Sequence, residues 1–243
     1  MQDIPEYWYT SWFNSPYYHI LYKDRDHTEA ALFMDKLTEH LQLAKGSKIL
    51  DLACGKGRHS IYLANLGYDV TGADLSPKSI EAAKQYERPG LRFVIHDMCL
   101  PFPEKFDAIF NLFTSFGYFE TPNDNLRAIR AIKESLAPGA IGVIDFLNVK
   151  HVAKNLVPQE HKMIDGIRFD IEKSVDDNYI IKKIDFEDQG RQYRFQERVA
   201  ALDLKTFQAY FEIAGVQLLN TYGDYQLNDF DPDSSERLIL VFE

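Results

Sequence analysis

Five short apolar runs alternate with stretches of helical spacing between residues 48 and 146. The runs are KILDL (48–52), YDVTGAD (68–74), LRFVIHD (91–97), FDAIFNLF (106–113) and AIGVIDF (140–146). Near-continuous apolar strands of this kind are typical of a parallel sheet that is covered by helices on both faces. Right-handed βαβ crossovers then connect the strands, so the pattern predicts an α/β fold with a mostly parallel sheet.

The first part of the chain is dominated by aromatic residues. Residues 1–22 contain both tryptophans of the chain and six tyrosine or phenylalanine residues, with Asp3 and Glu6 as the only formal charges. So much apolar area must pack against another surface. We therefore expect an N-terminal helical arm over residues 1–27, either docked on the body of the protein or placed as a lid over a ligand cleft.

A different pattern follows Phe146. Apolar side chains alternate with polar ones over residues 161–199, which indicates an antiparallel meander inserted at 151–200. A helix at 203–215 and two strands, at 216–225 and 235–243, are expected to end the chain as a hairpin. The expected organisation is a single domain over 1–243 that carries the arm and the insertion.

Composition excludes several classes of function. The net charge of −10 argues against a nucleic-acid partner, because phosphate backbones are held by clustered basic side chains. The two cysteines, Cys54 and Cys99, provide neither a disulfide framework nor metal-ligand spacing, so we expect free thiols and no metal. No apolar run approaches the roughly 20 residues that span a bilayer, and no secretory signal is recognisable. These features predict a cytoplasmic protein with no membrane partner.

The first apolar run leads into Ala53-Cys54-Gly55-Lys56-Gly57, and a helical stretch follows at once. Small residues let the backbone turn sharply, and the helix N-terminus adds exposed N–H groups. Acidic residues recur at this position of the next strands, because Asp51, Asp74 and Asp97 are spaced 23 residues apart. The carboxyl ends of parallel strands line the ligand crevice, so we expect these carboxylates to converge on one cleft.

The ligand of this loop has two candidate classes. A nicotinamide or flavin dinucleotide is bound by G-x-G-x-x-G, but the third position here is Ser60. Asp51 just before the loop would repel phosphates. A cationic ligand without phosphate suits the loop better, and S-adenosylmethionine (SAM) carries a sulfonium and an α-ammonium group.

The segment from Asp51 to Gly57 resembles the glycine-rich first motif of class I SAM-dependent methyltransferases. Gly57-Arg58-His59-Ser60 and the segment 114–119 are similar to an uncharacterised bacterial subgroup of the small-molecule type. The resemblance implies a Rossmann-like, seven-stranded sheet whose last strand is antiparallel. It also implies these cofactor contacts: Asp51, Ala53, Gly55 and Gly57 at the methionine portion, Asp74 at the ribose, Leu75, Asp97 and Met98 at the adenine, and Asn111, Leu112 and Phe113 beside the sulfonium.

Some side chains near the loop have both a functional and a structural interpretation. Arg58 is expected near the methionine carboxylate of SAM, or in an ion pair with an acid. Tyr18 and Tyr22 are expected to bind that carboxylate from a lid, or to pack as docking aromatics. His59 and Tyr118 are the candidates for catalytic groups, while no catalytic residue is assigned.

The predicted function is SN2 transfer of the SAM methyl group to an oxygen or nitrogen atom, or a carbon atom, of a small molecule, with S-adenosylhomocysteine as product. Two alternatives stay open at this point. One is a non-catalytic SAM-binding partner or regulatory module, and the other is an NAD(P)-dependent oxidoreductase. The insertion at 151–200 is expected either to shape the acceptor pocket or to pair two subunits in a homodimer.

Overall fold

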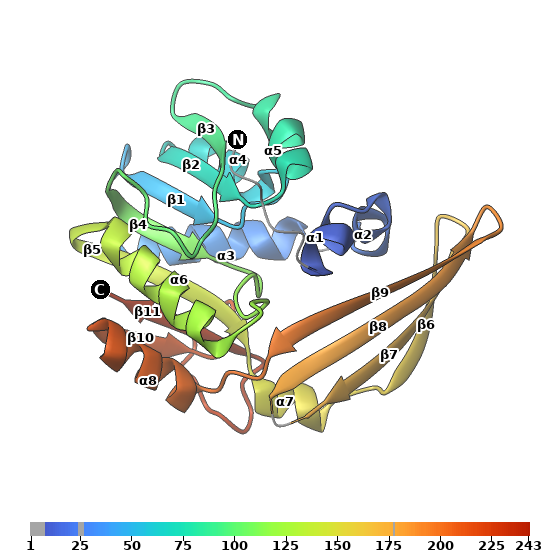
Figure 1. Ribbon diagram of the computed structural model, residues 1–243. Helices are drawn as coiled ribbons and strands as arrows, with labels where there is room; N and C mark the ends of the chain where they lie inside the picture. The colour runs from blue at the N-terminus through green and yellow to red at the C-terminus, as the bar shows by residue number, and fades with distance from the viewer. Residues whose placement is uncertain (1–7, 24–26, 177) are drawn as a thin grey trace. The chain divides into compact units, whose positions relative to one another are not determined.

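The computed structural model describes residues 8–23, 27–176 and 178–243 (Figure 1). The chain divides into two compact units. One unit contains residues 8–23 with Ala153–Ala201, and the other contains residues 27–152 with Leu202–Glu243. The aromatic arm and the inserted meander therefore belong to the same unit, although more than a hundred residues separate them in the chain.

The larger unit is built on a seven-stranded sheet. Its strands are β1 (Lys48–Leu52), β2 (Asp69–Asp74), β3 (Leu91–Ile95), β4 (Phe106–Asn111), β5 (Leu136–Leu147), β10 (Leu218–Tyr222) and β11 (Arg237–Phe242). They lie in the order β10-β11-β5-β4-β1-β2-β3. The pairs among β1 to β5 are parallel, whereas β11 is antiparallel to both β5 and β10. The predicted Rossmann-like α/β fold is confirmed.

Helices cover both faces of this sheet. They are α3 (His27–His40), α4 (Arg58–Asn65), α5 (Pro77–Lys84), α6 (Pro122–Ser135) and α8 (Leu204–Ala214), and α7 (Val149–Lys154) follows β5. Helices α6 and α8 contact each other on one face (Figure 1). On that side Phe207 packs on Phe146 and Phe211 packs on Phe242, with ring centroids 5.4 and 4.8 Å apart.

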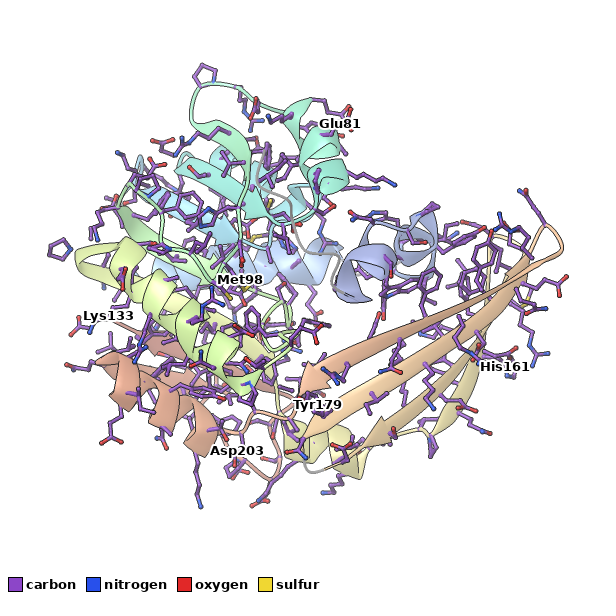
Figure 2. The ribbon with its side chains drawn as sticks, viewed as in Figure 1. Glu81, Met98, Lys133, His161, Tyr179 and Asp203 are labelled. Carbon is purple, nitrogen blue, oxygen red and sulfur yellow. The ribbon has the colours of Figure 1, made fainter. Side chains whose placement is uncertain are left out.

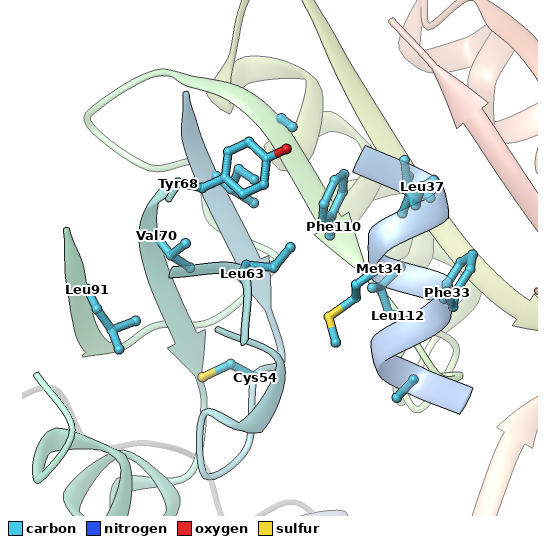
Figure 3. Close-up of a cluster of buried hydrophobic side chains, with 14 of the residues drawn as sticks. Phe33, Met34, Leu37, Cys54, Leu63, Tyr68, Val70, Leu91, Phe110 and Leu112 are labelled. Atoms are coloured by element: carbon cyan, nitrogen blue, oxygen red, sulfur yellow. The ribbon is translucent and has the colours of Figure 1, made fainter. Parts of the chain in front are cut away.

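The opposite face of the sheet buries the core that carries the glycine loop. Phe33, Met34 and Leu37 of α3 belong to one buried cluster with Phe110 and Leu112 at the end of β4 (Figure 3). Leu63, Val70 and Cys54 belong to the same cluster, so α3 and α4 pack on β1, β2 and β4 together. This packing makes the carboxyl edge of the sheet a rigid base for the loops that follow each strand.

The smaller unit is an antiparallel sheet with two short helices. The strands are β6 (Gln159–Ile164), β7 (Ile167–Val175), β8 (Tyr179–Asp188) and β9 (Arg191–Ala200), in that order across the sheet. Helices α1 (Trp8–Phe13) and α2 (Pro16–Leu21) share a core cluster with one face of the sheet, to which Trp12, Phe169, Ile171, Ile184 and Phe186 contribute. The predicted inserted meander is present, and so is the aromatic arm over residues 8–23; residues 1–7 and 24–26 of the predicted arm lie outside the described residues.

Most element boundaries follow the sequence pattern closely. The first strand covers Lys48–Leu52 as predicted, and Gly215 ends α8 in the left-handed conformation at φ 68°. Strand β6 was not separated in the prediction, because most of its side chains are exposed and give no alternation of burial. Within the described residues, no helix is both long enough and apolar enough to cross a membrane.

Candidate cofactor site

The loop between β1 and α4 turns through three residues with positive φ. Ala53 has φ 65°, Gly55 has φ 56° and Gly57 has φ 81°. A non-glycine residue in this region costs of order 1 kcal/mol, so the surrounding structure must hold Ala53 there. The hydrogen bond from the Cys54 N–H to the Ala73 carbonyl, at 3.0 Å, ties the loop to β2. This contact with β2 helps to hold the loop backbone in its positive-φ conformation.

The two glycines of the loop have different surroundings. A Cβ atom on Gly57 would lie 2.4 Å from the Phe93 ring, so this glycine lets α4 pack closely on β3. A Cβ atom on Gly55 would meet nothing within 4 Å. Gly55 is therefore the position where the backbone faces open space, as a closely approaching ligand requires.

Asp51 is a charged residue in the interior of the sheet. Its side chain is only 3% exposed, and its Oδ2 accepts a hydrogen bond of 2.6 Å from the Ser60 hydroxyl. Burial raises the pKa of Asp51 to about 6, the Ser60 hydrogen bond opposes this shift, and the negative charge of Asp74 adds to it. No Lys or Arg in the described part of the chain forms an ion pair with it. A cation placed here would lower the free energy of the carboxylate.

Asp74 lies at the carboxyl end of β2 and holds the glycine loop. Its Oδ2 accepts from the Gly55 N–H and its Oδ1 from the Ser76 N–H, each at 2.8 Å. Burial raises its pKa, and these two backbone hydrogen bonds oppose the shift. A carboxylate has about four lone-pair positions, so about two remain for the hydroxyls of a ligand.

The residues after β3 lie at the same edge of the sheet. Asp74 and Ile95 are register partners, and the His96 N–H donates to the Asp74 carbonyl at 3.0 Å. Asp97 therefore follows the neighbouring strand, and its Oδ1 accepts from the Cys99 N–H at 2.9 Å. Met98, labelled in Figure 2, and Leu75 are both half-buried beside this edge. The three predicted acids thus lie at or just beyond the carboxyl ends of three adjacent strands.

Strand β4 ends in a buried amide. Asn111 is fully buried, its Nδ2 donates to the Leu52 carbonyl at 2.9 Å, and its Oδ1 has no hydrogen-bond partner among the described residues. A buried polar oxygen without a partner is costly, and it is satisfied when a ligand donates to it. Leu112, the next residue, is buried in the core cluster.

The turn after β4 contains two consecutive left-handed residues. Phe113 and Thr114 both have φ 58°, a conformation that is unfavourable for an aromatic and a β-branched side chain. The Phe113 ring stacks on the His59 ring, with centroids 4.4 Å apart and an interplanar angle of 28°. The turn after β4 therefore contacts the helix that follows the glycine loop.

A buried ion pair holds this turn. Asp145 on β5 is completely buried, and its Oδ1 accepts from the Nε and Nη2 of Arg237 on β11 at 2.8 and 2.7 Å. Its Oδ2 accepts from the Phe113 N–H at 2.7 Å, and Arg237 Nη2 also donates to the Thr114 hydroxyl at 2.8 Å. The Tyr225 hydroxyl contacts the same Asp145 oxygen at 3.3 Å.

The remaining candidates lie in two places. Arg58 donates to the Nε2 of His59, at 3.2 Å from Nε and 2.7 Å from Nη2, so both side chains sit at the start of α4. Tyr118 is half-buried in the segment between β4 and α6. Tyr18 and Tyr22 belong to the smaller unit, where the Tyr22 hydroxyl donates to Glu197 at 2.7 Å and the two rings lie 5.0 Å apart. Their contact with SAM stays a prediction.

Sequence reasoning missed three residues of this edge, namely Ser60 as the partner of Asp51, and the pair Asp145–Arg237. Asp145 is the only charged residue in the apolar run 140–146, and Arg237 precedes the apolar run LILVF. A charge inside a buried strand requires a partner, so this pattern was the available signal. No group of three His, Cys, Asp or Glu side chains in the described ranges is arranged to hold a metal.

The order of the strands, the antiparallel last strand and the glycine loop at the end of β1 define a Rossmann-like fold of the methyltransferase type. Residues 49–139 match the family described as "Methyltransferase domain". The predicted resemblance to class I SAM-dependent methyltransferases is therefore confirmed for this part of the chain.

Known relatives agree with this assignment. The putative methyltransferase YqeM of Bacillus subtilis (strain 168) is 36% identical over 107 residues, which are 42% of this chain and 43% of that protein. The match thus spans less than half the length of that relative. A glycine/sarcosine N-methyltransferase of Aphanothece halophytica is 27% identical over 221 residues, which are 86% of this chain and 80% of that protein.

Solved structures show the same fold. The crystal structure of an S-adenosylmethionine-dependent methyltransferase from Clostridium acetobutylicum superposes with a TM-score of 0.78 at 19% identity. The superposition covers 93% of this chain and 95% of that one. The likeness therefore extends over both the seven-stranded sheet and most of the remaining chain.

Proposed function

We propose that the protein is a SAM-dependent methyltransferase that transfers the methyl group by SN2 displacement to an oxygen or nitrogen atom, or a carbon atom, of a small molecule. The observation that carries the proposal is the buried Asp51 carboxylate beside the glycine loop. It has a hydroxyl partner but forms no ion pair with a Lys or Arg of the described residues; its pKa is raised to about 6, although the charge of Arg58 opposes the rise. A ligand with an ammonium group and no phosphate would be attracted by this carboxylate, whereas a pyrophosphate would be repelled.

The residues present provide complementary groups for each part of SAM. Asp51 and the unpartnered Oδ1 of Asn111 would accept from the ammonium group, directly or through water. Asp74 would accept from the ribose hydroxyls with its remaining lone pairs, and Gly55 leaves room for close approach. Leu75, Asp97 and Met98 would contact the adenine, while Ala53, Gly57, Leu112 and Phe113 would surround the methionine portion.

SAM itself supplies an activated methyl group on a sulfonium. The chain would therefore mainly position the acceptor in line with the methyl–sulfur bond and exclude water. His59 and Tyr118 stay the candidates for groups that touch the acceptor, and Arg58, Tyr18 and Tyr22 stay candidates for the SAM carboxylate.

A small-molecule acceptor is supported by a relative that matches 86% of the chain, the glycine/sarcosine N-methyltransferase of Aphanothece halophytica. The net charge of −10 gives further support, because it disfavours nucleic-acid acceptors. Strand β6 is an exposed edge strand with mostly polar side chains. Pairing of two copies of the chain through this edge, to form a homodimer, is a separate prediction.

Thermal unfolding with ligands tests the proposal. SAM and S-adenosylhomocysteine are expected to raise the melting temperature, whereas NAD(P)H is not. Asp74→Ala should abolish the SAM effect. Asp69→Ala, at the exposed opposite end of β2, is the matched control and should retain it. Stabilisation by NAD(P)H alone, or full SAM affinity in Asp74→Ala, would contradict the assignment.

Turnover distinguishes an enzyme from a SAM-binding module. Formation of S-adenosylhomocysteine should accelerate with at least one member of a panel of small amines, amino acids and hydroxylated compounds. A protein that binds SAM but accelerates none of them would instead be the regulatory or partner subunit.

A further inference from the structure

Asp145 and Arg237 form a buried pair that the cofactor contacts above do not use. Asp145 is 0% exposed and the Arg237 side chain is 19% exposed. Replacing a buried ion pair by neutral side chains is often neutral or favourable for stability, so stability alone does not explain the pair. Its other contacts indicate what it does.

The remaining side-chain hydrogen bonds and ring contact of the pair are directed at the turn after β4 or at its neighbour Tyr225. Asp145 accepts the Phe113 N–H through its side chain at 2.7 Å and the Thr114 N–H through its backbone carbonyl at 3.0 Å. Arg237 binds the Thr114 hydroxyl, and its guanidinium lies over the Tyr225 ring at 5.4 Å. Two strands thus hold two consecutive residues that would otherwise leave the left-handed region.

The conformation of the turn also fixes the position of the Phe113 ring within a group of aromatic side chains. The Phe113 ring contacts His59 at 4.4 Å, Tyr225 at 5.5 Å and Phe33 at 6.1 Å between ring centroids. If Phe113 relaxed to negative φ, its ring would leave this stack and its N–H would leave Asp145. The pair is therefore mechanically linked to the helix that follows the glycine loop.

We infer that Asp145 and Arg237 are positioning residues for the methionine end of the cofactor, because they fix the Phe113–Thr114 turn. This inference rests on the proposed function. Neither residue is assigned a contact with the reacting atoms. Their effect is transmitted through Phe113, which borders the proposed position of the sulfonium.

The sheet order makes the effect local. Strand β1 lies between β4 and β2, so the turn after β4 and Asp74 are separated by two strand spacings, ~10 Å. The pair should therefore control the affinity for the methionine portion and leave the adenosine portion unaffected. A purely structural role gives no such difference.

The test compares two ligands on one set of variants. Asp145→Asn/Arg237→Met replaces the pair without leaving an unpaired charge, and Arg237→Met alone shows the effect of the cation. Lys150→Met, which removes the cation of an exposed ion pair with Asp233, is the matched control. Urea unfolding verifies that each variant folds cooperatively, and calorimetry gives the dissociation constants of S-adenosylhomocysteine and adenosine.

The double variant is expected to weaken S-adenosylhomocysteine binding by about tenfold, the size of one well-placed set of polar contacts, with adenosine binding within twofold of the unmodified protein. The control should change neither. If the double variant binds both ligands normally, or loses both to the same extent, the positioning role is wrong. If the unmodified protein binds neither ligand, the proposed function fails instead.

Discussion

Two buried carboxylates of the same sheet have opposite surroundings. The carboxylate of Asp145, on β5, accepts hydrogen bonds from Arg237, from the Phe113 N–H and from the Tyr225 hydroxyl. The backbone carbonyl of Asp145 accepts a further one from the Thr114 N–H. Asp51, on β1, has the Ser60 hydroxyl as its hydrogen-bond partner. Both are at most 3% exposed. The difference indicates that the fold gives Asp145 a hydrogen-bonded cation, although burial still raises its pKa, whereas the ion-pair position beside Asp51 is left for a ligand.

The largest effect is expected where the fold supplies the counter-charge. Asp145→Ala leaves Arg237 buried without its partner, so the free energy of unfolding should fall by about 3–5 kcal/mol. Urea denaturation followed by circular dichroism measures it. A loss below about 1 kcal/mol would mean that Arg237 reaches solvent easily in the variant. The ion pair with Asp145 would then not distinguish the surroundings of Asp145 from those of Asp51.

Removing the charge of Asp51 is expected to raise the free energy of unfolding, whereas removing that of Asp145 lowers it. The folded pKa of Asp51, about 6 against an ordinary value of 3.8, corresponds to a destabilisation on the order of 3 kcal/mol at neutral pH. Asp51→Asn removes the charge, so the ligand-free protein should become more stable at pH 7.5 by about 1–3 kcal/mol. SAM affinity should fall at the same time. A destabilised variant with normal SAM affinity would contradict the role given to Asp51.

The raised pKa of Asp51 also makes the free energy of unfolding depend on pH. Between pH 3.8 and 6 the folded carboxyl binds more protons than the unfolded one, so its contribution to stability falls as pH rises through this window and then levels off. From pH 5 to pH 7 the loss due to Asp51 is about 1 kcal/mol. The difference between the unmodified protein and Asp51→Asn isolates the titration of Asp51 and of the groups coupled to it from that of all distant groups. SAM binding should weaken as the pH falls below about 6, and a flat difference would refute the shifted pKa.

The smallest effect concerns the hydroxyl beside Asp51. Ser60→Ala removes one hydrogen bond to the carboxylate, which should lower the free energy of unfolding at neutral pH by about 1 kcal/mol or less. It should also raise the pKa of Asp51 further, since the Ser60 contact opposes the shift. An upward displacement of the pH at which SAM binding weakens is the measurement. A downward displacement would be inconsistent with the hydrogen bond seen here.

The contrast between the two carboxylates also explains what the sequence predicted. Asp51 was recognised because its signal is local: an acid, a glycine loop and a helix follow one another within ten residues. Strand β1 and the end of α8 were predicted for the same reason, since their patterns and glycine stops are contiguous. Asp145 was missed because its partner lies 92 residues further along the chain, and only the strand order brings the two together.

Backbone conformation was the other quantity that the sequence did not reveal. Phe113 and Thr114 are poor residues for positive φ, so local preference predicts an ordinary extended exit from β4. Tertiary hydrogen bonds override that preference. Gly57 was interpreted as a ligand-approach position, and the structure adds that its missing side chain is required by Phe93.

The place of Arg237 in the chain has a consequence for folding. The glycine loop and all five parallel strands precede it, so they can emerge from a ribosome and pair before β11 exists. Until β11 docks antiparallel to β5, Asp145 has no arginine partner, and the turn after β4 lacks the hydrogen bond from Arg237 to the Thr114 hydroxyl. A nascent chain that stops short of residue 237 would therefore have an assembled Rossmann-like core, while the turn that we place at the methyl-donor end would still be unlocked.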